Sequence, residues 1–298
     1  MLFLFCSDPQ APRQPDSAFA TEAEAVQSLD VAIGLLDYEA LAAGDDAAAV
    51  RRVPQREDEI AVYRGWMLKP GAYQRLFAAL LGRGVRLIND PDAYVHTHHL
   101  PASYSVIEGE TPRSVWIPVE GSVDFDAVMG LLLPFGDAPV LLKDYVKSQK
   151  HAWKEACFIP RASDREAVER VVRRFLALQD EDLNVGLVFR AFADLAPAGV
   201  HPKSGMPLAR EHRLFFLDGS LVAAFRYWDE ASYPAPDLPM DRLSTLAVRV
   251  KSRFFTMDVA ELREGGFNVI ELGDAQVSGL PDHADRVMFF EEIVRHLA

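Results

Sequence analysis

The 298-residue sequence has only two cysteines, Cys6 and Cys157, too few for a disulfide framework or a cysteine-rich zinc site. A reducing cytoplasm is therefore the expected location. No run of about eighteen apolar residues occurs, so no membrane-spanning helix is predicted. The apolar N-terminal stretch has no basic flank and is about half as long as a signal peptide requires. We interpret Leu2–Phe5 as a β-strand, and the missing flanking signals argue against lipid attachment at Cys6.

The chain also lacks an excess of positive charge. Its formal net charge is −13 and its pI is near 5.1, which argues against a general binder of nucleic acids or anionic membranes. A local basic cleft for a phosphorylated ligand remains compatible with these values. The hydrophobic content of 49% and charged content of 25% are typical of a globular protein with a large core. The length predicts two or three packed units.

Several familiar catalytic motifs are absent from the sequence. No G-x-G-x-x-G follows the first strand, and no G-x-x-x-x-G-K-[ST] occurs, which argues against a Rossmann dinucleotide site and a P-loop. The H-R-D and D-F-G motifs of protein kinases are missing. Without G-x-S-x-G, and without an evident His-plus-acid context for either cysteine, covalent hydrolase chemistry is unsupported.

The pattern of apolar runs predicts two kinds of architecture. Over residues 1–100, strands alternate with helices, including an amphipathic helix between Pro70 and Gly84, so we expect an open, largely parallel α/β sheet. The second half is predicted to be mostly antiparallel α+β. It contains a hairpin with the turn Asp218-Gly219, a hairpin with the turn Gly265-Gly266, and a closing helix from about residue 283.

Three acidic residues lie on or just after the last hairpin. Asp258 is on its first strand, Glu271 is near the end of its second strand, and Asp274 follows in the sequence NVIELGDAQVSGLP. Carboxylate oxygens converging from two strands and an exit turn are suited to Mg²⁺, which is usually bound together with substrate phosphates. The competing interpretation is a solvated strand end that turns at Gly273-Asp274.

Cations interrupt several apolar strands in the same half of the chain. A charge within such a strand is costly unless it is paired, so these residues either pair with carboxylates structurally or serve a ligand. Together with the acids, they predict a pocket for a Mg²⁺-nucleotide. The cations are Lys143, Lys147 and Lys150 around the segment VLLKDYVKSQK, Arg190 at the end of NVGLVFR, and Arg213 and Arg226 on the two arms of one hairpin.

Two further motifs are ambiguous. The segment HTHH, with His96, His98 and His99, has metal-ligand residues, but its Pro-Asp and Leu-Pro neighbours favour a partly exposed polar loop. In YRGWM, Arg64 precedes Gly65 and Trp66 at a strand end. Arg64 could bind a carboxylate with both guanidinium arms, with Arg113 as a second substrate residue. The alternative is an arginine packed on Trp66 for stability.

Taken together, these motifs resemble the ATP-grasp enzymes, and in particular the clade named for its two arginines and a lysine. The resemblance covers nearly the whole chain. It implies an N-terminal α/β unit at residues 1–134 and an ATP-grasp domain at 135–298, with subdomains of about 135–195 and 196–298. It rests on the segments LLKDYVKSQKHAW, LVFRAF, EHRLFFLDG, TMDVAEL and IELGDAQVSGLP, with YRGWML and HHLPASY upstream.

The resemblance also implies roles for individual residues. Lys143 would contact the nucleotide phosphates, Arg190 would lie at the hinge near the nucleotide, and Arg213 would touch phosphate or acyl phosphate, with Arg226 on the partner strand as a second catalytic candidate. The family's glycine-rich flap is missing after Lys143, so Lys147 and Ser148 would cover the phosphates in its place. Mg²⁺ would be bound by Asp258, Glu271 and Asp274.

The expected activity follows from the same family resemblance. An ATP-grasp enzyme of this type uses ATP and Mg²⁺ to activate a carboxylate as an acyl phosphate, which an amine then displaces. The carboxylate would belong to a small molecule or a peptide. The alternatives are a nucleotide-binding protein without ligase activity, and an ATP-dependent enzyme that acts on nucleic-acid ends, which the net charge of −13 disfavours.

Overall fold

The N-terminal part of the chain is a parallel four-stranded sheet with the order β2-β1-β3-β4. The computed structural model describes residues 1–202, 205–235 and 237–298. The sheet and its helices confirm the α/β unit predicted from the sequence. The elements are β1 (Leu2–Cys6), α1 (Ala20–Ser28), β2 (Ala32–Leu36), α2 (Tyr38–Ala42), α3 (Asp46–Val50), β3 (Glu59–Arg64), α4 (Pro70–Leu81), β4 (Val85–Leu87), α5 (Pro91–His98) and α6 (Leu100–Ile107).

Local sequence explains the main features of this unit. Every residue of β1 is buried, as expected for a central parallel strand that is covered on both faces. Pro70 is the first residue of α4, where its missing N–H group costs nothing. Gly84 lies just beyond this helix with φ of +68°, and a Cβ atom there would come within 1.9 Å of the Arg56 carbonyl oxygen. Only glycine therefore fits this tight turn into β4.

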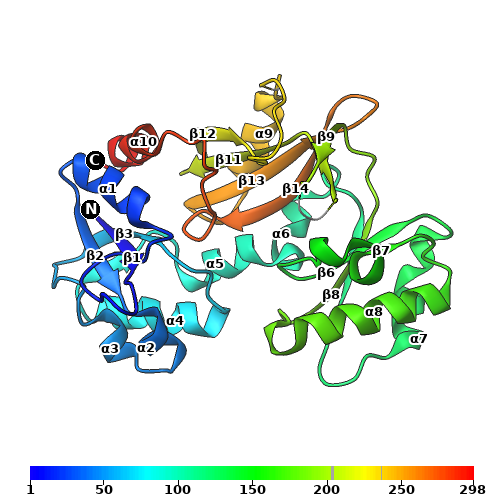
Figure 1. The fold of residues 1–298 in the computed structure, drawn as a ribbon, viewed down its shortest axis with the longest axis horizontal. Coiled ribbons are helices and arrows are strands. Elements are labelled where there is room, and N and C mark those ends of the chain that lie inside the picture. Colours follow the sequence, from blue (N-terminus) through cyan, green and yellow to red (C-terminus); the bar gives the residue numbers. More distant parts are fainter. Residues whose placement is uncertain (203–204, 236) are drawn as a thin grey trace.

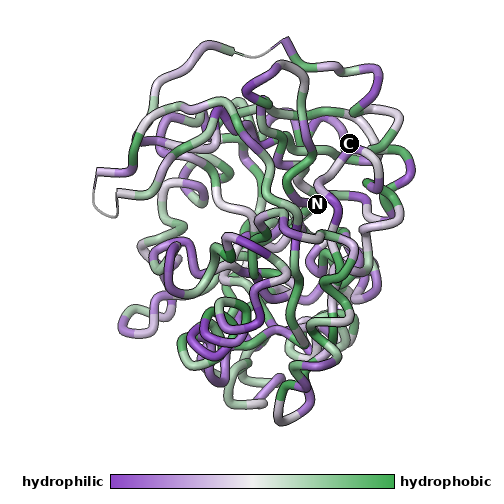
Figure 2. The backbone as a smooth tube through the Cα atoms, turned by 90° about the vertical axis from the view of Figure 1, so that its right-hand side faces the viewer, coloured by the Kyte–Doolittle hydropathy of each residue, from purple (hydrophilic) through white to green (hydrophobic). Residues whose placement is uncertain are grey.

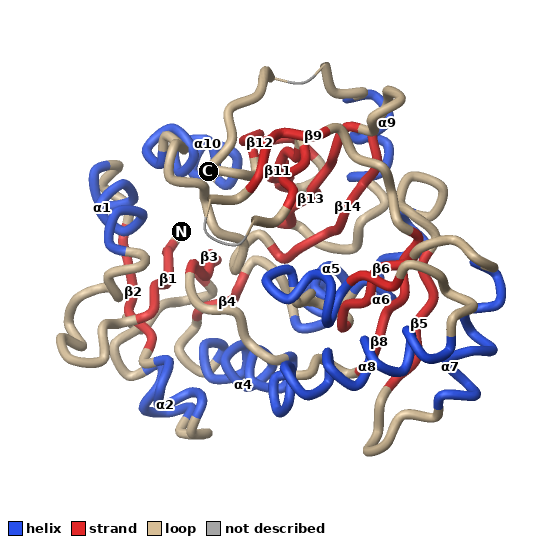
Figure 3. Tube along the Cα trace, turned by 45° about the vertical axis from the view of Figure 1, so that its right-hand side comes forward, coloured by secondary structure: helices blue, strands red, loops and turns tan. Residues whose placement is uncertain are grey.

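The second unit is an antiparallel sheet with the order β5-β8-β6-β7, packed against α7 and α8 (Figure 3). Asp164 caps the N-terminus of helix α8, and its side chain accepts a hydrogen bond from the Ala167 backbone N–H. Strand β5 pairs with β8, although β5 lies before the predicted domain boundary after residue 134 and β8 lies after it. That boundary would therefore divide one sheet between two domains. The elements are β5 (Ser114–Pro118), α7 (Phe125–Leu132), β6 (Val140–Asp144), β7 (Phe158–Ile159), α8 (Arg165–Gln179) and β8 (Gly186–Ala191).

The third unit is an antiparallel sheet with the order β12-β11-β13-β14. Both predicted hairpins are present. Asp218 and Gly219 have φ of +48° and +78°, while Gly265 and Gly266 have φ of +94° and +85°, the left-handed backbone that these turns require. The elements are β11 (Glu211–Leu217), β12 (Ser220–Arg226), α9 (Met240–Ala247), β13 (Phe254–Glu261), β14 (Phe267–Asp274) and α10 (Arg286–Leu297), preceded by the short ladder of β9 (Pro197–Val200) and β10 (Pro207–Ala209).

The first and third units share one hydrophobic core. Phe3 and Phe5 of β1 belong to the same buried cluster as Phe215 of β11 and Phe290 of α10. The rings of Phe3 and Phe290 are edge to face at 5.1 Å, a favourable arrangement for two aromatic rings. Figure 1 accordingly shows the C-terminal helix α10 beside α1, although these helices lie at opposite ends of the sequence. This packing fixes the position of the β11–β14 sheet relative to the N-terminal unit.

Hydrophobic segments are short throughout the chain. Figure 2 shows them alternating with hydrophilic segments along the backbone. Among the described residues, no helix combines the length and the hydropathy that a membrane crossing requires. Cys6 and Cys157 are both buried and free.

Candidate functional site

The chemically reactive side chains meet on one face of the β11–β14 sheet. Arg213 of β11 is the register partner of Asp258 on β13, and Asp258 is the partner of Glu271 on β14. Directly opposed residues of antiparallel strands share a face, so the three side chains form a row across three strands. Asp258, at the centre of the row, is only 1% exposed. The Gly265-Gly266 turn brings β13 and β14 together, and a β-bulge then shifts their register between Asp258 and Val259, so that Asp258 faces Glu271.

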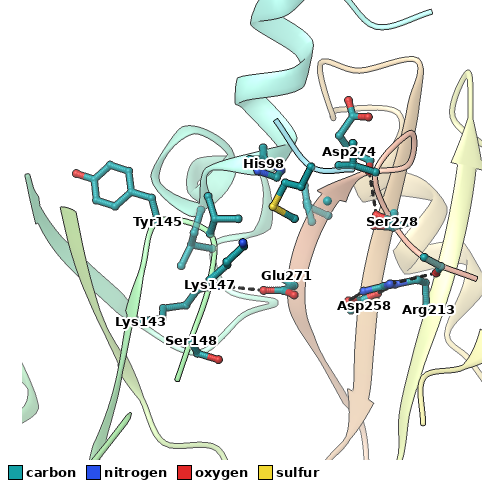
Figure 4. Close-up of a pocket in the computed structure, with 18 of the residues that line it drawn as sticks. His98, Lys143, Tyr145, Lys147, Ser148, Arg213, Asp258, Glu271, Asp274 and Ser278 are labelled. Carbon is teal, nitrogen blue, oxygen red and sulfur yellow. Dashed lines mark hydrogen bonds and ion pairs between the residues drawn. The ribbon is translucent and has the colours of Figure 1, made fainter. Parts of the chain in front are cut away.

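Two ion pairs organise the row. The Arg213 Nε and Nη2 atoms donate to the two carboxylate oxygens of Asp258 at 2.9 and 2.7 Å, a bidentate pair that fixes both side chains. Lys143 reaches across from β6 in the second unit, and its Nζ donates to Glu271 Oε2 at 2.9 Å (Figure 4). The β6 sheet and the β11–β14 sheet are thus bridged by opposite charges at this point.

A polar pocket of about 300 Å³ surrounds this row of charges. It continues into a second pocket of about 180 Å³, since both are lined by Lys143, Ser148, Lys150 and Glu271. The second pocket is walled mainly by apolar residues, including Leu141, Ala191, Met206 and Ile270. A cleft with a charged end and an apolar end fits a nucleotide, whose phosphates and base have the same division of polarity.

The loop that follows β6 brings further cations to the cleft. Lys147 and Ser148 line the polar pocket. The Lys150 ammonium lies 5.3 Å from the ring centres of both Tyr227 and Trp228, which follow β12. Such contacts between an ammonium group and aromatic faces are attractive. The loop therefore crosses the cleft from the β6 sheet to the β11–β14 sheet.

Burial and neighbouring charges shift the pKa values of the acidic groups in different directions. Burial disfavours ionisation of Glu271, but Lys143 and Lys150 outweigh it and lower its pKa to about 2. Burial raises the pKa of Asp258, although the Arg213 fork opposes this. Burial also disfavours the charged form of Lys150, but Tyr227 and the carboxylates of Glu211 and Glu271 raise its pKa. Glu271 and Lys150 are consequently both charged at neutral pH.

Asp258 and Glu271 are suited to Mg²⁺, but Asp274 is not. Asp258 and Glu271 offer oxygen atoms on the same face, which fits an ion that completes its shell with phosphate oxygens and water. Asp274 borders the same pocket, but its oxygens accept hydrogen bonds from Asn89 Nδ2 at 2.7 Å and from the Gln276 backbone and side-chain amides at 2.9 and 3.1 Å. Figure 4 shows its carboxylate pointing away from Asp258 and Glu271.

The structure does not bring the three predicted carboxylates together as one set of metal ligands. No group of three or more potential His, Cys, Asp or Glu ligands lies together within residues 1–202, 205–235 and 237–298. The Asp274 hydrogen bonds instead anchor the exit of β14 to the N-terminal unit. Burial raises the pKa of Asp274 to about 6, although its amide partners oppose this shift. In the geometry found here, Mg²⁺ would be held by two protein carboxylates together with phosphate oxygens.

Comparison with known proteins identifies the family. Residues 133–293, more than half of the chain, match the family model described as an ATP-grasp domain, family 3 of the clade named for two arginines and a lysine. The chain belongs to the ATP-grasp family. The predicted relationship and the predicted ATP-grasp fold are both confirmed. A comparison with curated protein sequences finds no match.

Solved ATP-grasp structures resemble the whole chain. D-cycloserine synthetase DcsG superposes with a TM-score of 0.61 at 14% identity, covering 100% of both chains. A RimK domain ATP-grasp protein from Sphaerobacter thermophilus DSM 20745 gives 0.60 at 12% identity and 98% coverage of each chain. The ATP-grasp ligase PsnB, in complex with a minimal precursor, Mg and ADP, superposes with a TM-score of 0.57 at 12% identity, and the match covers 99% of this chain and 98% of the PsnB chain. At these identities the likeness concerns the fold.

Within the ATP-grasp fold, Arg64 has a structural environment, which contradicts the predicted substrate role. Its side chain is 2% exposed, and its Nε and Nη2 atoms donate to both oxygens of Glu22 at 2.8 and 3.0 Å. The Nη1 atom donates to the backbone carbonyls of Ala275 and Ser278. Because these contacts engage all three guanidinium nitrogens of a buried side chain, no arm remains for a substrate. Trp66, the expected packing partner, instead lies 43% exposed against Phe19.

The other predicted arginines are spread around the site. Arg113 is exposed and lies over the Phe135 ring, away from the polar pocket. Arg190 lies in the apolar pocket, but its guanidinium donates to the backbone of β14 at Val269 and Ile270, so it joins the two sheets. Arg226 lines a small hollow beyond Arg213 and donates to Ser232 Oγ at 3.4 Å. Only Arg213 directly contacts the carboxylates of the row.

Two residues of the site were not predicted from the sequence. Glu211 is 5% exposed and lines the apolar pocket, and its carboxylate has no hydrogen bond or ion pair within the described part of the chain. Burial raises its pKa to about 7, although Lys150 opposes this. Its sequence signal is its place two residues before Arg213 in the segment EHRLFFLDG. His98 lines the polar pocket, and HTHH forms the end of helix α5 rather than the expected loop.

A third hollow of about 500 Å³ lies beside the polar pocket. The two share Met67 and Lys147, and the hollow extends over the N-terminal unit to Tyr38 of α2 and Arg75 of α4. Space next to Lys147 is therefore available for a group larger than a phosphate. The β3–α4 loop forms the wall on this side, and it includes Met67 of the YRGWM motif but not Arg64.

Proposed function

We propose that this ATP-grasp protein is an ATP- and Mg²⁺-dependent ligase that joins a carboxylate to an amine. The γ-phosphoryl group of ATP passes to a carboxylate oxygen, which breaks its bond to the β-phosphate oxygen and releases ADP. The amine nitrogen then attacks the carbonyl carbon of the acyl phosphate. Phosphate leaves, the nitrogen loses a proton, and an amide is formed.

The observation that carries this proposal is the row of Arg213, Asp258 and Glu271 facing Lys143 and Lys150 across one cleft. Phosphoryl transfer requires positive charge around the equatorial oxygens and little covalent participation by the protein. Lys143, Lys150 and Arg213 supply that charge, and Mg²⁺ on Asp258 and Glu271 would neutralise the β- and γ-phosphates. Phosphate binding would draw Lys143 away from Glu271 and release this carboxylate for the metal.

The apolar pocket would receive the base and the ribose of ATP. Leu141, Ala191 and Ile270 offer apolar contacts to the base. The guanidinium group of Arg190 is already bonded to the backbone of β14. We therefore assign recognition of the sugar to Glu211. Its unpartnered carboxylate would accept hydrogen bonds from ribose hydroxyl groups, because a buried carboxylate is costly without such donors.

Replacement of Lys143 by alanine tests the nucleotide site. We expect Lys143→Ala to raise the Kd for MgATP about 10- to 100-fold, because a charge-assisted contact to phosphate is lost. Lys154, exposed on the short helical turn Trp153–Cys157 between β6 and β7, provides a matched control, and Lys154→Ala should bind MgATP like the unmodified protein. Isothermal calorimetry gives the Kd for MgATP of each variant. Equal affinities for a folded Lys143→Ala variant and the unmodified protein would remove Lys143 from the phosphate site.

The activity itself is tested with ATP, Mg²⁺ and pools of carboxylates and amines, with ADP, AMP and phosphate measured separately. A ligase of this type should form ADP and phosphate only when a matching pair is present. Formation of AMP would contradict an acyl-phosphate intermediate. Tight nucleotide binding with no turnover in any pool would support a nucleotide-binding protein without ligase activity. Turnover only with RNA or DNA ends would support an ATP-dependent enzyme that acts on nucleic-acid ends.

A further inference from the structure

His98 is the one histidine among the residues that line the polar pocket. It is the last residue of helix α5, and its side chain is almost completely enclosed, with 6% of the residue exposed. Its imidazole has no hydrogen bond or ion pair to any part of the chain that the structure describes. Figure 4 shows it on the pocket wall above Lys147, in the same pocket as Glu271. A buried polar ring that faces a pocket without a partner points to a ligand.

An aromatic stack holds the His98 ring in place. The Tyr94 ring lies 4.8 Å from His98 on one side and 3.9 Å from Tyr73 on the other, and both pairs are nearly parallel. Hydrogen bonds anchor the stack at its base, since the Tyr73 hydroxyl donates to the Asn89 carbonyl and the Tyr94 hydroxyl donates to the Leu68 carbonyl, each at 2.7 Å. The stack covers one face of the imidazole and uses neither of its nitrogen atoms.

Burial and the neighbouring charges determine the protonation state of the His98 imidazole. Burial, together with His99, Lys147 and Lys143, lowers the pKa of His98 to about 3, and Glu271 opposes this only in part. The ring is therefore neutral near pH 7, with one N–H donor and one acceptor nitrogen. The same lysines attract an anion to this end of the pocket. A neutral N–H group can then donate to that anion without adding another charge to the cluster.

Resting on the ligase function proposed above, we propose that His98 is a further catalytic residue, whose imidazole N–H donates a hydrogen bond to a non-bridging oxygen of the γ-phosphoryl group of ATP. During transfer, the bond from phosphorus to the β-phosphate oxygen breaks and the bond to the carboxylate oxygen forms. His98 keeps its proton throughout this step. Its contribution is a fixed dipole aimed at the transferring oxygens, which needs no rearrangement as the reaction proceeds.

The alternative is that the imidazole only completes the aromatic stack. Two substitutions separate these roles. His98→Phe keeps a flat ring against Tyr94 but removes the N–H donor, whereas His98→Gln keeps a donor and removes the ring. His96 lies on the same helix and does not line the pocket, so His96→Gln serves as the matched control for a histidine substitution in α5.

The test compares the binding of MgADP with that of the Mg²⁺ complex of AMP-PNP, whose γ-phosphoryl group is not transferred. The unmodified protein should bind AMP-PNP more tightly than ADP. In His98→Phe the ratio of the two Kd values should fall about tenfold, since one hydrogen bond to a charged oxygen is lost. His98→Gln should recover part of the ratio, and His96→Gln should leave it unchanged.

The possible results are distinguishable. A purely structural role would weaken both nucleotides alike and leave the ratio intact in His98→Phe, which would overturn the inference. An unmodified protein that binds AMP-PNP no more tightly than ADP would also overturn it. If the unmodified protein binds neither nucleotide, the proposed function fails as well, and that result is separate from any effect at His98. Thermal melting establishes that each variant is folded.

Discussion

Replacing Glu271 with glutamine is expected to lower turnover by about three orders of magnitude while the protein remains folded. Glutamine has almost the same shape, but it removes the negative charge that would hold Mg²⁺ against the phosphates. A bound metal supplies several kcal/mol of transition-state stabilisation, and about 1.4 kcal/mol corresponds to a factor of ten in rate. The low pKa of Glu271, which Lys143 and Lys150 maintain against burial, means that the native residue is fully ionised at neutral pH.

The measurement is kcat as a function of Mg²⁺ concentration, with ADP release as the signal. Glu264 lies exposed near the Gly265-Gly266 turn of the same hairpin, and Glu264→Gln should retain the activity of the unmodified enzyme. Lys143 loses its partner in Glu271→Gln, so a modest change in melting temperature is compatible with the assignment. A kcat within about threefold of the unmodified enzyme at saturating Mg²⁺ would exclude Glu271 as a metal ligand.

Replacing Arg64 with methionine is expected to lower the free energy of unfolding by about 3–5 kcal/mol. The substitution leaves the Glu22 carboxylate, which accepts both arms of the guanidinium group, buried without its counter-ion. It also removes a donor from the Ala275 and Ser278 carbonyls, which tie the segment after β14 to the N-terminal unit. The loss is large because the pair is buried, whereas an exposed ion pair contributes about 0–1 kcal/mol.

Chemical denaturation monitored by fluorescence gives the free energy of unfolding. Arg86→Met removes the exposed pair with Asp58 and should cost no more than about 1 kcal/mol. The double variant Arg64→Met with Glu22→Met should regain much of the lost stability, because no unpaired charge then remains buried. If the single Arg64→Met variant instead kept its melting temperature and had a raised KM for one organic substrate, the predicted substrate role would be restored.

Local sequence signals were sufficient for the elements and for part of the site. Alternating strands and helices, the pair Asp218-Gly219 and the pair Gly265-Gly266 predicted the parallel sheet and both hairpins, because these signals act over a few neighbouring residues. The same hairpin logic placed Asp258 and Glu271 on facing strands. The motifs on them carried the resemblance to the ATP-grasp family that residues 133–293 confirm.

Long-range packing decided what the sequence left open. Arg64 meets Glu22 from 42 residues away, and Asp274 meets Asn89 from 185 residues away, so neither side chain is free for a ligand. A motif cannot reveal such partners, because burial and pairing depend on which elements the folded chain brings together. The same holds for His98, which local sequence predicts in a polar loop and which the Tyr73–Tyr94 stack holds at the pocket wall. The sequence by itself determined the strands, the turns and the acids of the hairpin, whereas only the tertiary structure decided which charges neutralise each other and which ones face the cleft.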